Sequence, residues 1–238
     1  MRSDSAEETA PVGSITVDYP DSEAVLSHGF RFRPAWWTPR VPAGWGSFLE
    51  RLPAEERGYH RIARADLLAA ATDHGLPQAL LAGYVWGTGS SAFLVGRRAR
   101  VFRANDNQYI NDTLNVVAST LRGGNAVEAY ASMLRGQSQS LKYLGPSFFT
   151  KFLYAADSHG GKRGRALILD QFVAVALNAL HDWGIPRYGP WEPTTYERWL
   201  DLAHSIADAA SVEVDGDVRA DAIEMAYFNY GRQIAAKR

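Results

Sequence analysis

The chain of 238 residues is predicted to adopt a mostly helical, all-α fold, and three observations support this prediction. From Ile62 onward, apolar residues recur at the three- and four-residue spacing of amphipathic helices. No long alternation of apolar and polar residues, the pattern of half-buried strands, interrupts them. Hydrophobic residues make up 46% of the chain and aromatic residues 12%, which suits a globular core.

The N-terminal quarter is expected to be less regular. Residues 1–13 are acidic and rich in small side chains, without the basic start and apolar run of a secretory signal, so we expect a disordered tail. Residues 14–238 are then expected to form a single domain. Prolines interrupt residues 14–60 repeatedly, so this stretch is expected to wrap over the main body, with at most a small strand pair.

The helices are expected to follow one another from residue 65. The first two cover 65–74 and 78–85, and the glycine-rich sequence Trp-Gly-Thr-Gly at 86–89 is expected to form a turn. Further helices are expected over 105–122, 126–135, 141–157, 171–183, 196–210 and 219–235. Polar residues suited to cap helix starts, through side-chain oxygens that accept bonds from first-turn amides, are Asn125, Thr194 or Thr195, and Asp170.

The composition excludes several kinds of site. The chain has no cysteine, which excludes disulfides, thiolate metal sites and cysteine nucleophiles. The histidines show no metal-ligand spacing, and no Walker A or GxSxG motif occurs, so we expect neither a metal nor a small-molecule cofactor. No apolar segment approaches the length of a membrane span. We expect a cytoplasmic monomer without membrane association.

Positive charge is concentrated locally although the net charge is only −1. Asp157 is the only acid among the basic residues Arg135, Lys142, Lys151, Lys162, Arg163 and Arg165. Such a local excess indicates a phosphate-binding surface, and the alternative is an ordinary solvated face. A second basic group, which either contacts the opposite strand of a nucleic acid or coats a surface, comprises Arg97, Arg98, Arg100 and Arg103.

The segment 141–154 reads Leu-Lys-Tyr-Leu-Gly-Pro-Ser-Phe-Phe-Thr-Lys-Phe-Leu-Tyr. Gly145 can take the conformation of a tight turn, and Pro146 suits the first position of a helix. Amides at that helix start can hold a phosphate, so the segment predicts a helix-hairpin-helix at about 137–157 that grips a DNA backbone without reading sequence. The predicted DNA-binding residues are Lys142, Gly145, Ser147, Lys162, Arg163 and Arg165.

A second motif follows the hairpin. The apolar run Ala-Leu-Ile-Leu at 166–169 delivers the carboxylate of Asp170 to the start of a helix, within the segment 166–178. Together the two motifs resemble the helix-hairpin-helix DNA glycosylase superfamily, most closely its 8-oxoguanine DNA glycosylase branch, which includes bacterial proteins described only as having that fold. The resemblance is specific over about 141–178.

The resemblance implies a two-lobed helical body with the site in the cleft between the lobes. It also implies an enzyme that flips a damaged base out of double-stranded DNA and cuts its N-glycosidic bond. Asp170 matches the family's essential aspartate, which stabilises the sugar cation and activates the nucleophile. An isolated aspartate at this place would most often be a plain helix cap.

The family lysine is not at its usual position. Bifunctional members carry it two residues after the hairpin glycine, where this chain has Ser147. Lys151 lies one helical turn later on the same face, and its amine can lean back over Ser147. We hypothesise that Lys151 is a displaced nucleophile that attacks C1′ and forms a Schiff base. The alternatives are a phosphate-binding lysine, a solvated lysine, or a monofunctional enzyme in which Asp170 activates water.

A flipped base needs an aromatic or apolar slot. The candidates for stacking are Trp36, Trp37, Trp86, Trp183 and Phe148, and Gln171 is the candidate for a hydrogen bond to the base edge. The sequence thus predicts a DNA glycosylase-like enzyme acting on a modified base, such as an oxidised purine, with or without an AP lyase step. The alternatives are a non-catalytic DNA-binding module that reuses the fold and a helical protein-interaction adaptor.

Overall fold

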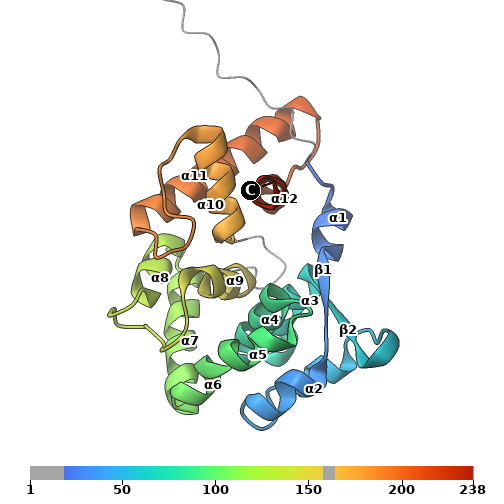
Figure 1. Cartoon of the computed structure of the whole chain (residues 1–238). Coiled ribbons are helices and arrows are strands. Elements are labelled where there is room, and N and C mark those ends of the chain that lie inside the picture. The colour runs from blue at the N-terminus through green and yellow to red at the C-terminus, as the bar shows by residue number, and fades with distance from the viewer. Residues whose placement is uncertain (1–18, 158–163, 238) are drawn as a thin grey trace, which may run out of the picture.

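The computed structural model describes residues 19–157 and 164–237 and is mostly helical, as predicted (Figure 1). Its N-terminal elements are α1 (Ser22–Ser27), β1 (Gly29–Phe32), α2 (Pro34–Trp37) and β2 (His60–Ala63). The helices that follow are α3 (Arg64–Ala69), α4 (Leu76–Thr88), α5 (Ala92–Arg98), α6 (Arg100–Ala104), α7 (Asn107–Arg122), α8 (Ala126–Met133), α9 (Pro146–Asp157), α10 (Gln171–His181), α11 (Pro193–Glu213) and α12 (Ala220–Ala236). Within these ranges no helix is long and apolar enough to cross a membrane.

The predicted strand pair is present. Strands β1 and β2 are antiparallel, with Gly29 opposite Ala63 and Phe32 opposite His60. A side chain on Gly29 would lie 2.5 Å from the Ile62 carbonyl oxygen, so only glycine allows this close pairing. The pair holds β1 against α4 and thereby fixes the position of Phe30, which matters for the site below.

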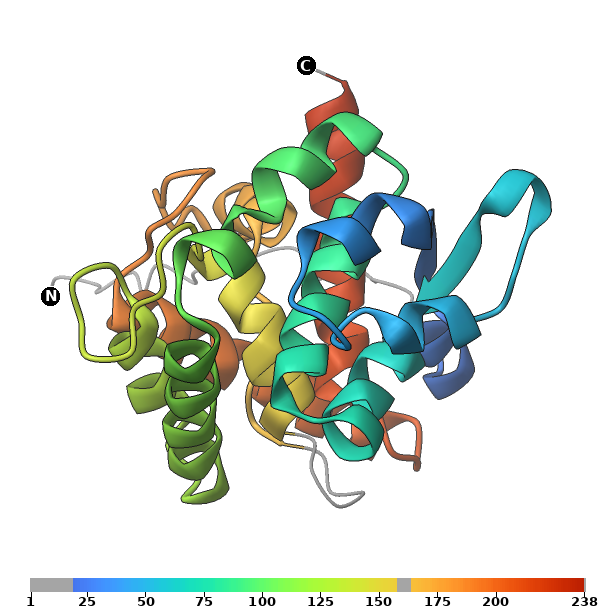
Figure 2. The same cartoon turned by 90° about the horizontal axis from the view of Figure 1, so that it is seen from below.

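The helices form two lobes, which we define as α3–α9 and α10–α12 (Figure 1). In the first lobe, α9 is central and packs on α3, α4, α7 and α8 (Figure 2). In the second lobe, α12 crosses α10 so closely that a side chain on Gly231 would lie 1.9 Å from the Phe172 carbonyl oxygen. This contact fixes the first turn of α10, where Asp170 caps the helix.

Several predicted boundaries are wrong. The sequence 86–89 is not a turn, because α4 continues to Thr88 and ends at Gly89 with φ of +60°. Residues 134–145 form turns rather than the start of a helix, so the regular helix predicted over 141–157 begins only at Pro146. The N-cap of α11 is Glu192, followed by Pro193, instead of Thr194 or Thr195. Asn125 is at the expected N-cap position, but its side chain makes no capping bond.

Candidate active site

The hairpin before α9 has a different turn from the one predicted. The left-handed residue is Tyr143, with φ of +66°, and not Gly145. The Tyr84 hydroxyl donates to the Tyr143 carbonyl at 3.0 Å, which holds this turn in place. Gly145 is exposed, and a side chain there would meet nothing within 4 Å. The glycine therefore leaves the backbone open to a close approach from outside, which is what a phosphate contact needs.

Asp170 is the N-cap of α10, as predicted. Its Oδ1 accepts the N–H of Phe172 at 2.9 Å and that of Val173 at 3.3 Å. The preceding run 166–169 is buried, and the hydroxyl of Thr150 in α9 donates to the Leu169 carbonyl. These bonds leave Oδ2 of Asp170 facing Lys151.

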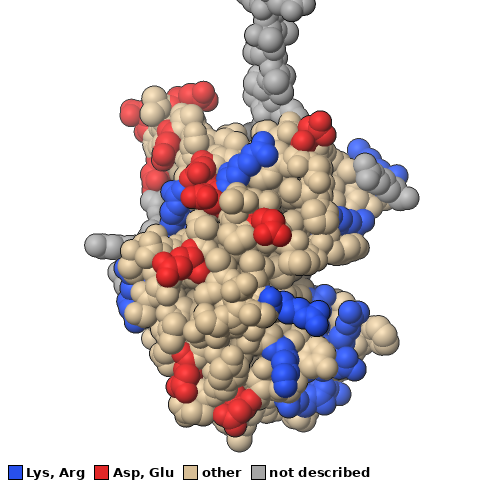
Figure 3. Space-filling view, turned by 90° about the vertical axis from the view of Figure 1, so that its left-hand side faces the viewer, with Lys and Arg blue, Asp and Glu red and all other residues tan. Residues whose placement is uncertain are grey.

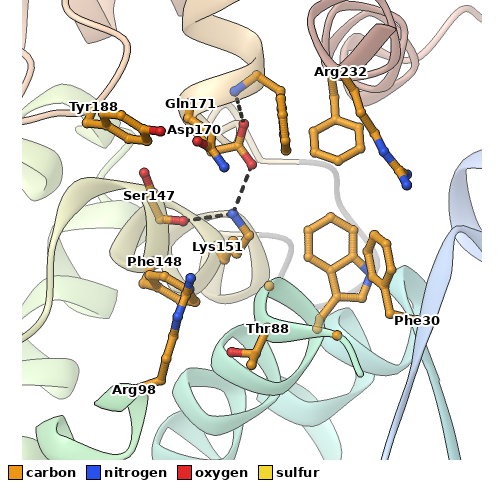
Figure 4. A pocket seen from close by; sticks show the side chains of 15 residues that line it. Phe30, Thr88, Arg98, Ser147, Phe148, Lys151, Asp170, Gln171, Tyr188 and Arg232 are labelled. Carbon is orange, nitrogen blue, oxygen red and sulfur yellow. Dashed lines mark hydrogen bonds and ion pairs between the residues drawn. The ribbon is translucent and has the colours of Figure 1, made fainter. Parts of the chain in front are cut away.

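Lys151 projects from α9 toward Asp170, and its side chain is buried (Figure 4). Its Nζ donates to the Ser147 carbonyl at 2.7 Å and lies 3.5 Å from Oδ2 of Asp170. The predicted lean toward Ser147 is therefore confirmed, and the alternative of a solvated surface lysine is wrong. Burial lowers the pKa of Lys151, while the Asp170 carboxylate acts in the opposite direction.

Two glycines of α4 make room for this lysine. A side chain on Gly83 would lie 3.3 Å from Cβ of Lys151, and one on Gly87 would lie 3.0 Å from its Cε. Gly83 and Gly87 are one helical turn apart and so face α9 together. This spacing was a signal in the sequence, but the interpretation of 86–89 as a turn concealed it.

If the protein is the glycosylase that the sequence predicts, replacing Gly87 with alanine should slow base release on the order of 10-fold to 100-fold, because a displacement of about 1 Å at a reacting group has such an effect. The new methyl group would press on Cε of Lys151 and on the Phe148 ring, both 3.0 Å away, and move the amine from Asp170. Single-turnover rates at saturating DNA measure this effect, and thermal melting checks the fold. An unchanged rate would contradict the assigned position of the lysine.

Lys151 and Asp170 line a cavity of about 410 Å³ between the two lobes. Figure 4 shows aromatic side chains around the lysine–aspartate pair, among them Phe30, Phe148 and Tyr188. The sequence analysis identified Trp86, Phe148 and Gln171, which do line it. Lining residues that it did not assign to the site include Phe30, Phe172, Tyr188, Phe228 and Arg232.

Three predicted base-stacking residues lie elsewhere. Trp37 is fully buried in the core, and Trp36 packs edge-on against Tyr59 with ring centroids 5.9 Å apart. The guanidinium of Arg198 lies over the Trp183 ring, 4.1 Å from the ring centroid. None of the three lines the cavity. The Pro-Ala-Trp-Trp segment forms α2, which packs on α5. The prediction failed because sequence alone cannot distinguish a core tryptophan from one at a pocket.

The basic residues of 135–165 do not form one footprint. Lys142 is exposed beside the hairpin, whereas Lys151 is buried in the cavity. Arg165 lies beyond the other end of α9, a helix of about 18 Å at 1.5 Å per residue, and pairs with Asp201 of α11. Its role as a DNA contact stays a prediction, and such a contact would be separate from the hairpin. Lys162 and Arg163 lie outside the described residues, as does the predicted tail 1–13.

His28 lies behind the aromatic wall of the cavity. Its ring centroid is 5.1 Å from that of Phe30, 5.3 Å from that of Trp86 and 5.6 Å from that of Phe228. Burial, and then the nearby Arg64, lower the pKa of His28 from 6.5 to about 4. Between about pH 4 and pH 6.5, the unfolded chain therefore binds a proton at His28 that the folded protein does not bind.

The free energy of unfolding should fall as the pH drops from about 6.5 to about 4, since protonation of His28 favours the unfolded chain. We expect His28 to contribute about 2 kcal/mol to this loss, after a discount for the partly exposed ring. Urea denaturation across this range measures it. The variant His28→Phe should lose less stability than the wild type, and parallel curves for the two proteins would contradict the assignment.

A family model described as "Putative 8-oxoguanine DNA glycosylase OGG-like protein" matches residues 23–228. This match includes both lobes, the hairpin, Lys151 and Asp170. No curated protein and no solved structure matches the chain. Since the family model spans most of the sequence, the chain belongs to the OGG-like family of 8-oxoguanine DNA glycosylase proteins.

Proposed function

We propose that the protein is a DNA glycosylase that excises a modified base, such as an oxidised purine, after the base leaves the duplex. The observation that supports this most directly is the buried pair of Lys151 and Asp170, 3.5 Å apart, on the wall of an aromatic cavity. A cavity with flat aromatic walls suits a planar base that has been rotated out of the stack. The family and the hairpin indicate DNA as the partner.

The amine of Lys151 is suited to act as the nucleophile. A neutral amine is required for attack, and burial lowers the pKa of Lys151 toward the range in which that form is populated. The amine bonds to C1′ as the N-glycosidic bond breaks, and the bonding electron pair leaves with the base, which takes up a proton. Loss of a proton from nitrogen and opening of the sugar ring then give a Schiff base. Water releases it, or a β-elimination cuts the strand.

Asp170 has a separate role in this proposal. Its charge is held close to Lys151 by two backbone N–H bonds from the first turn of α10, so it is fixed before substrate arrives. A fixed carboxylate stabilises positive charge that develops on the sugar as the base departs. If water instead of Lys151 is the nucleophile, the same carboxylate is positioned to accept its proton.

The two alternative functions fit the site less well. A DNA-binding module would not need Asp170 and Lys151 to converge on a cavity, yet both line it. In an adaptor, a buried charged pair would have no use and would carry a desolvation cost. The arrangement therefore favours an enzyme over either alternative.

The test is cleavage of a panel of duplex oligonucleotides, each with one modified base, with and without hot alkali. We expect wild-type protein, but not Asp170→Asn, to release at least one base. Strand breaks that need alkali would show base release without a lyase step, and breaks without alkali would show the lyase. Duplex binding without release of any base would favour the binding module.

A further inference from the structure

Helix α5 begins shortly after Gly89, one of the residues that line the cavity. Its inner face belongs to the site: Arg98 lines the cavity, and its guanidinium lies 4.2 Å from the centroid of the Phe148 ring. Side chains on the opposite face of α5 do not pack in the core. Phe93 on that face is 90% exposed, more than any other large hydrophobic residue of the described chain.

Gly96 lies on the same face of α5, three residues after Phe93. Its φ is not positive, and a side chain there would meet nothing within 4 Å. Neither backbone conformation nor packing therefore requires a glycine, which weakens a helix interior relative to alanine. The missing side chain leaves the helix backbone open to the approach of another molecule.

Arginines surround this glycine. Arg97 is exposed and follows Phe93 at the four-residue spacing of one helix face. Arg100, the first residue of α6, is exposed as well. Arg103 is also exposed and donates to the Gly96 carbonyl at 3.1 Å. The stretch 89–105 contains no acidic residue. Figure 3 shows Lys and Arg side chains gathered beside an indentation of the surface.

We propose that this face of α5, together with Arg100 at the start of α6, lies against duplex DNA beside the extruded nucleotide. We call this surface the α5 ridge (Phe93, Gly96, Arg97 and Arg100). The inference rests on the proposed function. Gly96 admits the sugar–phosphate backbone, and Arg97 and Arg100 contact phosphates. Phe93 enters the base stack where the nucleotide has left, as exposed apolar side chains do in proteins that distort DNA.

The phosphate contacts are tested by fluorescence anisotropy on two labelled duplexes, one undamaged and one with a tetrahydrofuran abasic-site analogue. Arg97→Gln and Arg100→Gln should weaken binding of both duplexes equally. Each should also reduce the slope of log K against log salt concentration by about 0.9. The matched control is Arg122→Gln, because Arg122 is exposed at the far end of α7, a helix of about 24 Å at 1.5 Å per residue, and should leave the slope unchanged.

The role of Phe93 has a different signature. Phe93→Ala should lower the preference for the abasic duplex over the undamaged one by about fivefold or more, the scale of one lost base–aromatic stack. Phe93→Leu, which keeps an apolar side chain, should retain most of that preference. Val212→Ala removes another exposed apolar side chain, 83% exposed at the end of α11, and should change nothing.

Gly96→Ala separates a binding role from a structural one. The variant should melt at a higher temperature, because alanine is the better helix former, and yet bind both duplexes more weakly. Wild-type affinity and salt slope in this variant and in both arginine variants would overturn the inference. Base release by the wild type, lost in Asp170→Asn, would then still support the proposed function, so the two failures are distinguishable.

Discussion

Asp170→Asn should reduce the rate of base release on the order of 10³-fold, within the range that a charged acid–base group contributes. The amide keeps an oxygen that can accept the N–H groups of Phe172 and Val173, so α10 should stay capped. What is lost is the negative charge beside Lys151, and with it the stabilisation of a developing sugar cation. Single-turnover assays on the base identified by the panel measure the effect.

Asp170→Ala is the matched control, because it removes the cap as well as the charge. This variant should lose about 1 kcal/mol of stability from the missing cap in addition to the activity. Thermal or urea unfolding of the three proteins separates the two contributions. If Asp170→Asn released base at nearly the wild-type rate, Asp170 would be a helix cap alone, and the proposed mechanism would be wrong.

Lys151→Gln should abolish any covalent adduct that borohydride traps between protein and DNA, since an amide cannot form a Schiff base. Lys151→Arg should fail equally, because a guanidinium stays protonated while keeping the positive charge beside Asp170. Comparison of the two variants distinguishes the loss of the nucleophile from the loss of the positive charge. Wild-type protein that releases a base but yields no adduct would identify a monofunctional enzyme.

The same lysine predicts a dependence of activity on pH. Base release should rise with pH as Lys151 loses its proton. The midpoint of this rise should lie below pH 10.5, the ordinary pKa of a lysine, because burial lowers the pKa of Lys151. Any residual activity of Lys151→Gln should not show this rise with pH. A wild-type rate that is flat with pH up to that value would exclude the lysine as the group that must be neutral.

A buried ion pair lies next to this site. Arg64 of α3 pairs with Glu224 of α12, and both side chains are fully buried. The Arg64 guanidinium lies 5.4 Å from the centroid of the Trp86 ring and 5.2 Å from that of Tyr154. The pair thus joins the two lobes directly behind the aromatic wall. The sequence offered no signal for it, because the two residues are 160 positions apart.

Local features of the chain were predictable because they depend on neighbours in sequence. The 3.6-residue period located the longer helices but not the short α5 and α6, and the proline after Gly145 suited the start of α9. Asp170 was identified as a cap because capping involves only the next three residues. The lean of Lys151 toward Ser147 followed from the direction of helical side chains. The likeness of the hairpin and Asp170 to the glycosylases rested on the same short segment.

Only the tertiary structure decided which residues surround the reacting pair. The walls come from β1, α4 and α12, which are distant in sequence and meet through packing. Packing also buried Lys151 against Gly83 and Gly87, sent Trp37 into the core, and placed Arg165 a helix length from the hairpin. The burial of a side chain, and the pKa shift that follows from it, depend on which distant elements cover it and exclude water. The linear order of residues does not contain that information.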